Sequence, residues 1–428
     1  MLADDFPLAL QVEVSSACNL DCFMCQRRSW VSGEEGLMPL SLFRKLEGSL
    51  CEAERVILYG IGEPLMNSDI VEMVAFARRV MGKGGEISLS TNGVLLTPKL
   101  AGMLVDAGLT SLYVSLDSLN EEKLKKIRRG IDYVGALENL KFLLKKFGSD
   151  VEVGLEYVVM RENLGELPEF VAEAAGMDAN HIFVSHIVPY FEEAASQAVY
   201  TTVSEEAIEA GKELLGRGWR VIVEAARFFV SLGYVGSIME SSEVELLSEA
   251  WRKAEAMGVE LNVPLLLSGE VDVNLLEAVK KTFSETERVA REHGVKITLP
   301  PVSFSVKGRS CPYVEKKTAV IRWDGMVAPC QEYLHDHQLY VNKHSKTFKA
   351  HLFGDIKKSS LKEIWGSGEY TEFRKKIEAL PETVPWCGNC PYSTLKCWFV
   401  DGNELDCYGN SPSCSECIYS TGMAKCNI

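Results

Sequence analysis

The sequence predicts an α/β protein in which a six-unit β/α barrel, closed or partly closed, precedes a small cysteine-rich domain. Two observations predict this organisation. Short apolar strands alternate with amphipathic helices six times between residues 9 and 190, and this alternation is typical of parallel strands joined by right-handed crossovers. Of the 13 cysteines, three lie near the N-terminus and nine follow residue 310, whereas Cys51 stands alone and is expected to be buried.

Composition excludes several classes of function. The chain has 428 residues, of which 46% are hydrophobic and 25% charged, as in an ordinary globular protein of two or three domains. A net charge of −15 argues against a nucleic-acid-binding surface, which would be basic. No apolar run reaches the roughly 18 residues of a membrane span, and the N-terminus lacks a signal-peptide pattern. We therefore expect a cytoplasmic protein without membrane contact, whose cysteines serve metal or redox chemistry.

The elements follow from hydrophobic periodicity. Strands are expected over residues 8–14, 55–59, 87–90, 111–116, 151–160 and 181–188. Helices are expected over residues 40–50, 68–80, 97–106, 124–144 and 164–175. Four parts result: a lead-in (1–8), the barrel (9–190), an α/β extension of unknown role (191–304) and the cysteine-rich domain (305–428). The extension should contain helices 242–258 and 274–294 and a strand at 295–299.

Three cysteines follow the first strand at the spacing C-x3-C-x2-C: Cys18, Cys22 and Cys25. They cannot all pair as disulfides, and they are one ligand short of a closed tetrahedral zinc site. Three thiolates suit a [4Fe–4S] cluster whose fourth iron stays open to a small molecule. A zinc site completed from elsewhere, or chance clustering, is the alternative. The loop sits at the C-terminal end of a strand, where barrel active sites are built.

This spacing resembles the signature of the radical S-adenosylmethionine (radical SAM) enzymes, although Met24 replaces the aromatic residue usual before the last cysteine. The resemblance implies a partial (β/α)6 barrel of the TIM type. It also implies that the open iron binds S-adenosylmethionine through its methionyl amino and carboxylate groups. One electron then cleaves the sulfonium to methionine and a 5′-deoxyadenosyl radical, so the three cysteines are the expected catalytic residues.

Further candidate residues for the cosubstrate site lie at the ends of the next strands. Gly60, Gly62, Glu63 and Pro64 resemble the family's GGEP motif with Ile61 inserted, and glycines there let backbone carbonyls approach the methionyl ammonium. Beyond this turn, the candidate cosubstrate contacts are Ser90, Asn92, Ser115, Asp117, Arg128 and Arg129. Asp117 and Ser115 offer polar groups near the ribose, and one arginine pairs with the methionyl carboxylate. A turn and a solvated helix face are the alternatives.

The tail carries the remaining metal candidates. Cys311 and Cys330 bracket a hairpin with an Asp-Gly turn. His335 and His337 beyond it are expected at the surface, with metal ligation or proton transfer as the alternative. The other cysteines are Cys387, Cys390, Cys397, Cys407, Cys414, Cys417 and Cys426. Paired C-x2-C units also suit structural zinc. The pattern resembles the SPASM domain, which implies one or two auxiliary [4Fe–4S] clusters.

The family's order assigns Cys311 and Cys330 to one auxiliary cluster and Cys387, Cys390 and Cys397 to the other. The last four cysteines of the chain compete for the places that remain.

The segment 406–417, together with 322–325 and 328–330, resembles maturases associated with tungsten-containing aldehyde ferredoxin oxidoreductases. The resemblance implies that the partner is that enzyme or its tungstopterin cofactor, with an electron donor such as ferredoxin. A radical SAM maturase of peptides or proteins, acting by sulfatase-type oxidation or thioether formation, is one alternative. A non-catalytic iron–sulfur electron carrier is another, but it would not need an open-site cysteine triplet.

Overall fold

The computed structural model describes residues 6–218, 242–269, 271–395 and 397–428. Most of the lead-in expected at 1–8 lies outside the described residues. No described helix is long and apolar enough to cross a membrane.

Within this part of the chain, ten strands form one sheet, in the order β10–β9–β8–β6–β5–β4–β1–β11–β12–β15. In chain order they are β1 (Ala9–Val12), β4 (Arg55–Ile57), β5 (Glu86–Thr91), β6 (Ser111–Ser115), β8 (Glu152–Val159), β9 (His181–His186), β10 (Lys296–Thr298), β11 (Thr318–Ile321), β12 (Met326–Ala328) and β15 (Gly354–Asp355). All neighbours from β10 to β11 pair in parallel, whereas β12 and β15 are antiparallel. The six predicted barrel strands are confirmed, and the extension and the tail add β10 and β11 at either end.

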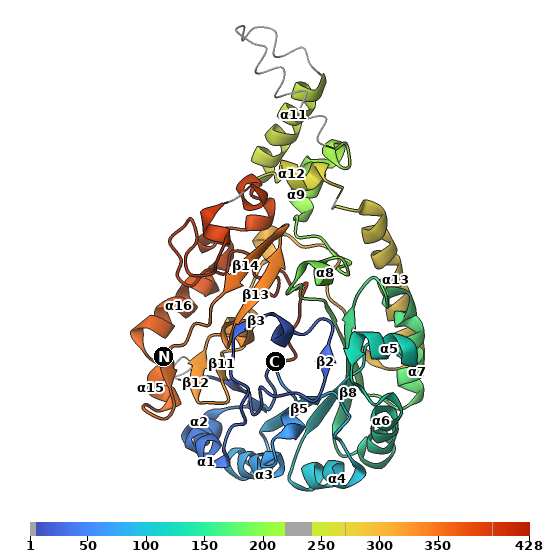
Figure 1. Ribbon diagram of the computed structural model, residues 1–428, viewed down its shortest axis with the longest axis vertical. Helices are drawn as coiled ribbons and strands as arrows, with labels where there is room; N and C mark the ends of the chain where they lie inside the picture. The colour runs from blue at the N-terminus through green and yellow to red at the C-terminus, as the bar shows by residue number, and fades with distance from the viewer. Residues whose placement is uncertain (1–5, 219–241, 270, 396) are drawn as a thin grey trace.

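Helices cover the outer face of this curved sheet (Figure 1). They are α1 (Leu40–Phe43), α2 (Glu47–Glu52), α3 (Ile70–Met81), α4 (Pro98–Asp106), α5 (Glu121–Ile127), α6 (Tyr133–Phe147), α7 (Leu167–Gly176) and α13 (Val273–His293). The single helix predicted over 124–144 is wrong. Gly130 adopts a positive φ of 89°, which ends helical geometry, and the Asp132 side chain caps α6 by accepting from the Gly135 amide.

The break between α5 and α6 has a function in the fold. Arg128–Arg129 forms the short strand β7, which pairs antiparallel with β2 (Asp21–Cys22) of the cysteine loop. The two arginines expected on a helix therefore lie on a strand that holds the loop.

Part of the extension, with α9, α11 and α12, and the β13–β14 pair of the tail stand above the barrel in Figure 1. Helices α8 (Glu192–Ala195), α9 (Glu205–Ala210), α11 (Ser242–Met257) and α12 (Val263–Leu267) belong to the extension. In the tail, β13 (Asp336–Val341) pairs with β14 (His344–Phe348) and with β3 (Trp30–Ser32), which follows the cysteine loop. α15 (Leu361–Trp365) and α16 (Gly368–Glu378) follow β15 in the tail.

The last residues of the chain return into the barrel, where Figure 1 marks the C-terminal end. The Lys425 amide donates to Ser185 Oγ of β9 at 3.0 Å, and the Asn427 side-chain amide donates to Glu156 Oε1 of β8 at 3.4 Å. The tail therefore contacts β8 and β9 inside the barrel, and one of these contacts is to Glu156, which also faces the candidate site.

Candidate active site

The cysteine loop is held by the turn that follows β4. The Glu63 amide donates to the Ala17 carbonyl at 2.8 Å, directly before Cys18. A Cβ atom on Gly62 would lie 2.4 Å from that carbonyl oxygen, so only glycine allows this approach. The predicted glycine turn and the cysteine triplet are therefore adjacent.

A buried ion pair supports the other side of the loop. Arg128 Nε lies 2.7 Å from Asp117 Oδ2, and Arg128 Nη1 lies 3.9 Å from Cys22 Sγ. Burial opposes the charge of Arg128, but Asp117 and Cys22 outweigh it and raise the pKa of the guanidinium. The structure thus brings together three of the predicted site residues, and it gives Arg128 and Asp117 each other as partners. Their contact with a cosubstrate stays a prediction.

The three thiols lie in a partly desolvated environment. Burial raises the pKa of Cys22 to about 12 and also raises the pKa of Cys18 and of Cys25, although nearby arginines oppose the shift. A soft cationic centre offsets the cost of forming thiolates in such a place. A cluster with three thiolate ligands fits these residues.

Polar side chains at the ends of β5 and β6 face the same region. The Asn92 amide donates to Asn19 Oδ1 in the cysteine loop at 2.8 Å. The Ser90 and Ser115 hydroxyls donate to Glu156 Oε2 at 2.5 and 3.1 Å. Glu156, on the inner face of β8, escaped the sequence analysis, although the alternation along that strand marks it as facing the barrel interior.

Glu63 and Pro64 support the loop from a buried position, whereas Arg129 lies at the surface. The buried Glu63 carboxylate accepts from the Thr91 hydroxyl at 2.6 Å and from the Asn92 amide at 2.8 Å, and Pro64 beside it is buried. Arg129 is exposed and lines an open surface pocket of about 490 Å³ together with Cys18 and Arg28.

Glu13, directly after β1, joins the barrel to the tail. Glu13 is fully buried, and both of its carboxylate oxygens lie 3.0 Å from His335 Nε2. His337 is also fully buried, and its Nε2 lies 3.3 Å from Glu332. The expectation that these two histidines lie at the surface is wrong. His337 shares one face of β13 with Leu339 and Val341, an alternation that was visible in the sequence.

Glu332 is the centre of this interface, two residues beyond Cys330. Its carboxylate accepts from the Tyr190 hydroxyl at 2.8 Å, the Tyr419 hydroxyl at 3.1 Å and the Gln26 amide at 3.4 Å. Gln26 directly follows Cys25. Glu332 thus links the N-terminal cysteine loop to the tail cysteines through one buried carboxylate.

Eight tail cysteines line two separate cavities. The inner quartet consists of Cys311, Cys330, Cys414 and Cys417 and lines a cavity of about 50 Å³. The outer quartet consists of Cys387, Cys390, Cys397 and Cys407 and lines a cavity of about 240 Å³. Two sets of four thiols are the donor sets that two cubane clusters need.

Two cysteines belong to neither quartet, and of these Cys426 packs beside the inner one. Cys426 lines neither cavity and lies 3.3 Å from the Tyr313 hydroxyl. Cys51 is exposed, so the expectation that it is buried is wrong.

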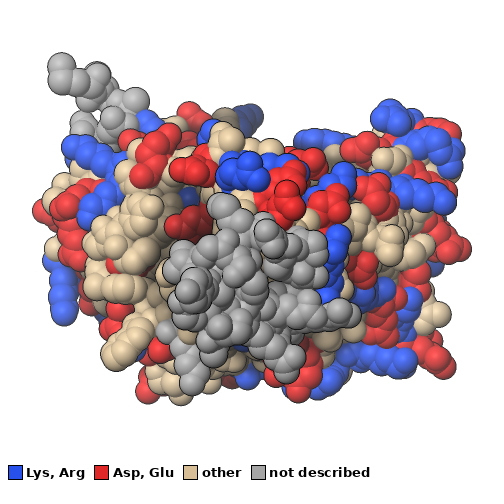
Figure 2. All heavy atoms as spheres, turned by 90° about the horizontal axis from the view of Figure 1, so that it is seen from above, with Lys and Arg blue, Asp and Glu red and all other residues tan. Residues whose placement is uncertain are grey.

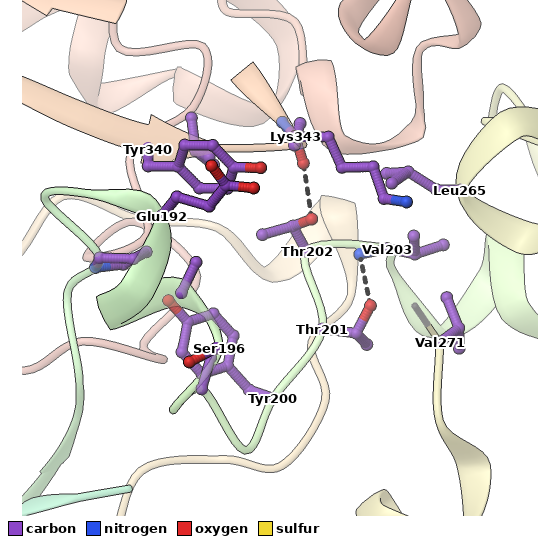
Figure 3. Close-up of a pocket in the computed structure, with 15 residues that line it drawn as sticks. Glu192, Ser196, Tyr200, Thr201, Thr202, Val203, Leu265, Val271, Tyr340 and Lys343 are labelled. Atoms are coloured by element: carbon purple, nitrogen blue, oxygen red, sulfur yellow. Dashed lines mark hydrogen bonds between the residues drawn. The ribbon is translucent and has the colours of Figure 1, made fainter. Parts of the chain in front are cut away.

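A larger pocket of about 520 Å³ opens above the barrel, between α8, the 200–203 segment, α12 and the β13–β14 turn (Figure 3). Glu192 and Tyr340 lie side by side on one wall, and Lys343 extends toward Leu265 on the other. Thr202 donates to Asn342 Oδ1 at 2.6 Å at the base of the pocket. The pocket is lined by polar and apolar side chains and lies between the extension and the tail, with Pro189 at the end of the barrel.

Residues 12–174 match the model of the radical SAM superfamily, and residues 311–391 match that of the SPASM iron–sulfur cluster-binding domain. The chain belongs to the radical SAM superfamily. It is an enzyme of this class, and its domains imply a [4Fe–4S] cluster, S-adenosylmethionine and auxiliary iron–sulfur clusters.

Similar proteins cover the chain to different extents. A tungsten-containing aldehyde ferredoxin oxidoreductase cofactor-modifying protein of Pyrococcus furiosus is 28% identical over 98% of this chain and 97% of its own length. A probable GTP 3′,8-cyclase of Methanococcus maripaludis is 30% identical over 44% of this chain and 67% of its own length. The crystal structure of Streptococcus suis SuiB bound to S-adenosylmethionine has a TM-score of 0.52 at 13% identity, covering 86% of this chain and 68% of that one. The fold is therefore shared with a protein whose structure has been solved with S-adenosylmethionine bound.

Proposed function

We propose that this radical SAM enzyme is a maturase that modifies a tungsten-containing aldehyde ferredoxin oxidoreductase or its tungstopterin cofactor. The observation that carries the proposal is the similarity to a tungsten cofactor-modifying protein along nearly the whole of both chains. That similarity includes the extension and the tail, whereas the match to the GTP cyclase covers under half of this chain. In this proposal the extension and the tail determine which substrate binds.

Cys18, Cys22 and Cys25 hold the cluster that binds S-adenosylmethionine. When bound, the cluster and S-adenosylmethionine supply a 5′-deoxyadenosyl radical by one-electron cleavage. The turn at Gly60 and Gly62 presents backbone carbonyls to the methionyl ammonium. The remaining contacts come from the strand ends and β7, with Glu63, Pro64, Ser90, Asn92, Ser115, Asp117, Arg128 and Arg129 as the proposed set.

The inner and outer quartets each hold one auxiliary cluster in this proposal. Glu332 positions the inner quartet against the N-terminal loop, because it lies two residues after Cys330 and its carboxylate accepts a hydrogen bond from the Gln26 side chain. The pocket at Glu192 and Lys343 admits the part of the substrate that stays outside the barrel. We further propose a ferredoxin as electron donor and action in the cytoplasm, where the thirteen cysteines, none of them in a disulfide, stay reduced.

The test is a labelling experiment on the target. The enzyme, reconstituted anaerobically with iron, sulfide and S-adenosylmethionine, is mixed with tungsten oxidoreductase produced without any maturase. Mass spectrometry of the oxidoreductase and of its extracted pterin should reveal one altered species, formed together with 5′-deoxyadenosine. The Cys18→Ala variant should give neither product. Abundant 5′-deoxyadenosine without any change in protein or pterin would overturn the substrate assignment and favour the peptide-maturase alternative.

A further inference from the structure

Exposed apolar side chains concentrate in one short segment of the tail. Among the described residues, most other large exposed apolar side chains are scattered, as is normal on a protein surface. Between residues 392 and 408 there are six, which we call the aromatic rim: Tyr392, Leu395, Trp398, Phe399, Leu405 and Tyr408. Trp398 is 90% exposed, and Tyr392 and Tyr408 are 67% and 66% exposed. A cluster of this kind marks an interaction surface.

The aromatic rim adjoins the outer quartet of cysteines in the sequence and shares part of its cavity. Each of Cys390, Cys397 and Cys407 is followed within two positions by an exposed aromatic residue of the rim. Phe399 and Tyr408 also line the 240 Å³ cavity that the quartet encloses. Cys407 is exposed, Cys390 and Cys397 are partly exposed and Cys387 is buried, so part of the quartet lies close to solvent.

The rim itself is mainly apolar. Among the described residues of its segment, the exposed charged side chains are Asp401 and Glu404, and Glu404 pairs with Lys349 at 3.0 Å. Seen from above, the left side of Figure 2 carries an area with few charged side chains. Six exposed apolar side chains beside two carboxylates favour a partner that docks mainly through apolar contact.

We propose that the aromatic rim is the docking surface for a ferredoxin-type protein that exchanges single electrons with the cluster held by the outer quartet. The inference rests on the proposed assignment of that quartet as an auxiliary cluster. One electron leaves the reduced partner and enters the oxidised cluster; no bond forms or breaks. A redox centre behind exposed rings is the feature that selects a redox partner over other proteins.

The size of the rim agrees with this partner. At their observed exposures the four rings present roughly 500 Å² in total, taking about 200 Å² for each fully buried ring. Transient electron-transfer contacts bury less than about 1,200 Å² over both partners, whereas permanent dimers bury about 2,000 Å² or more. The rim therefore suits a short-lived encounter and is too small for a stable second copy of this chain.

The test compares a protein donor with a small-molecule donor. Stopped-flow absorbance would follow the reduction of the auxiliary clusters by a reduced two-[4Fe–4S] ferredoxin and, separately, by reduced methyl viologen. We expect Trp398→Ala and Tyr392→Ala each to slow reduction by ferredoxin about tenfold, as for central interface aromatics. The viologen rate should stay unchanged, because neither side chain lines the cluster cavity.

Trp251→Ala is the matched control, since Trp251 is 54% exposed on α11, away from the quartet in sequence, and both of its rates should equal those of the native protein. Equal rates of reduction by ferredoxin in native and Trp398→Ala protein would overturn the proposal. So would a reduction rate of the native protein that does not saturate as the ferredoxin concentration rises. Zinc bound at the outer quartet would overturn it as well. If Trp398→Ala instead weakens capture of the tungsten oxidoreductase alone, the rim binds substrate and the redox assignment is wrong. With reduced viologen as the electron donor, Trp398→Ala should still modify the substrate. This measurement separates failure of the docking proposal from failure of the proposed function.

Discussion

The buried pair between Asp117 and Arg128 makes a quantitative test of how the cysteine loop is held. The Asp117 side chain is fully buried and that of Arg128 is 10% exposed, with Nε and Oδ2 2.7 Å apart. Removing one partner of a buried pair leaves an uncompensated charge and costs about 3–5 kcal/mol. At an effective dielectric constant near 20, two charges about 4 Å apart attract by about 4 kcal/mol, which agrees. Asp117→Asn should therefore lower the free energy of unfolding by about 3–5 kcal/mol.

The assay is urea unfolding of the metal-free protein followed by circular dichroism, with bound iron measured in parallel after reconstitution. The control is Glu121→Gln, which removes an exposed pair with Lys125 on α5 and should cost less than about 1 kcal/mol. The double variant Asp117→Asn with Arg128→Met should recover much of the loss, because an apolar side chain leaves no buried charge. A loss below about 1 kcal/mol in Asp117→Asn would refute the argument that this pair stabilises the loop.

Two further predictions concern packing and pH. Gly62→Ala places a methyl group against the Ala17 carbonyl and should lower the iron content of the N-terminal triplet. The control Gly165→Ala, whose methyl group would meet open space, should bind iron normally. Equal iron content in the two variants would show that the close approach at Gly62 is unimportant. Burial lowers the pKa of His186 to about 4. Between pH 6.5 and 4 the imidazole is therefore protonated in the unfolded chain but stays neutral in the folded protein. The free energy of unfolding should fall by about 3 kcal/mol between pH 6.5 and 4 for this reason. His186→Phe should remove that part of the pH dependence, as measured by urea titrations at several pH values. An unchanged pH dependence in the variant would contradict the prediction.

Much of the barrel followed from periodicity, and much of the site did not. The six strands and the glycine turn were visible because apolar runs and glycines are local signals. The split of the helix over 124–144 was missed, since the charged run around Arg128 suits a helix face as well as the edge strand β7. Pairing with β2 is a long-range contact that no local pattern reveals.

The buried polar interface was missed for a related reason. Glu13 and His335 are 322 positions apart in the chain, and only the folded protein brings their side chains within 3.0 Å. Alternation along β1 does place Glu13 on the face opposite Val12 and Val14, so its inward direction was predictable but its partner was not. The division of the tail cysteines into two quartets likewise depended on the fold, since spacing alone left four of them open.

The central claim is that the N-terminal triplet generates the radical. The most direct measurement is 5′-deoxyadenosine formed from S-adenosylmethionine under dithionite, in native protein and in the variant with Cys18, Cys22 and Cys25 all changed to alanine. Native protein and the control Cys51→Ala should form it, and the triple variant should form none while keeping iron at the tail quartets. If the triple variant, with its circular dichroism unchanged, still forms 5′-deoxyadenosine, the triplet does not hold the catalytic cluster.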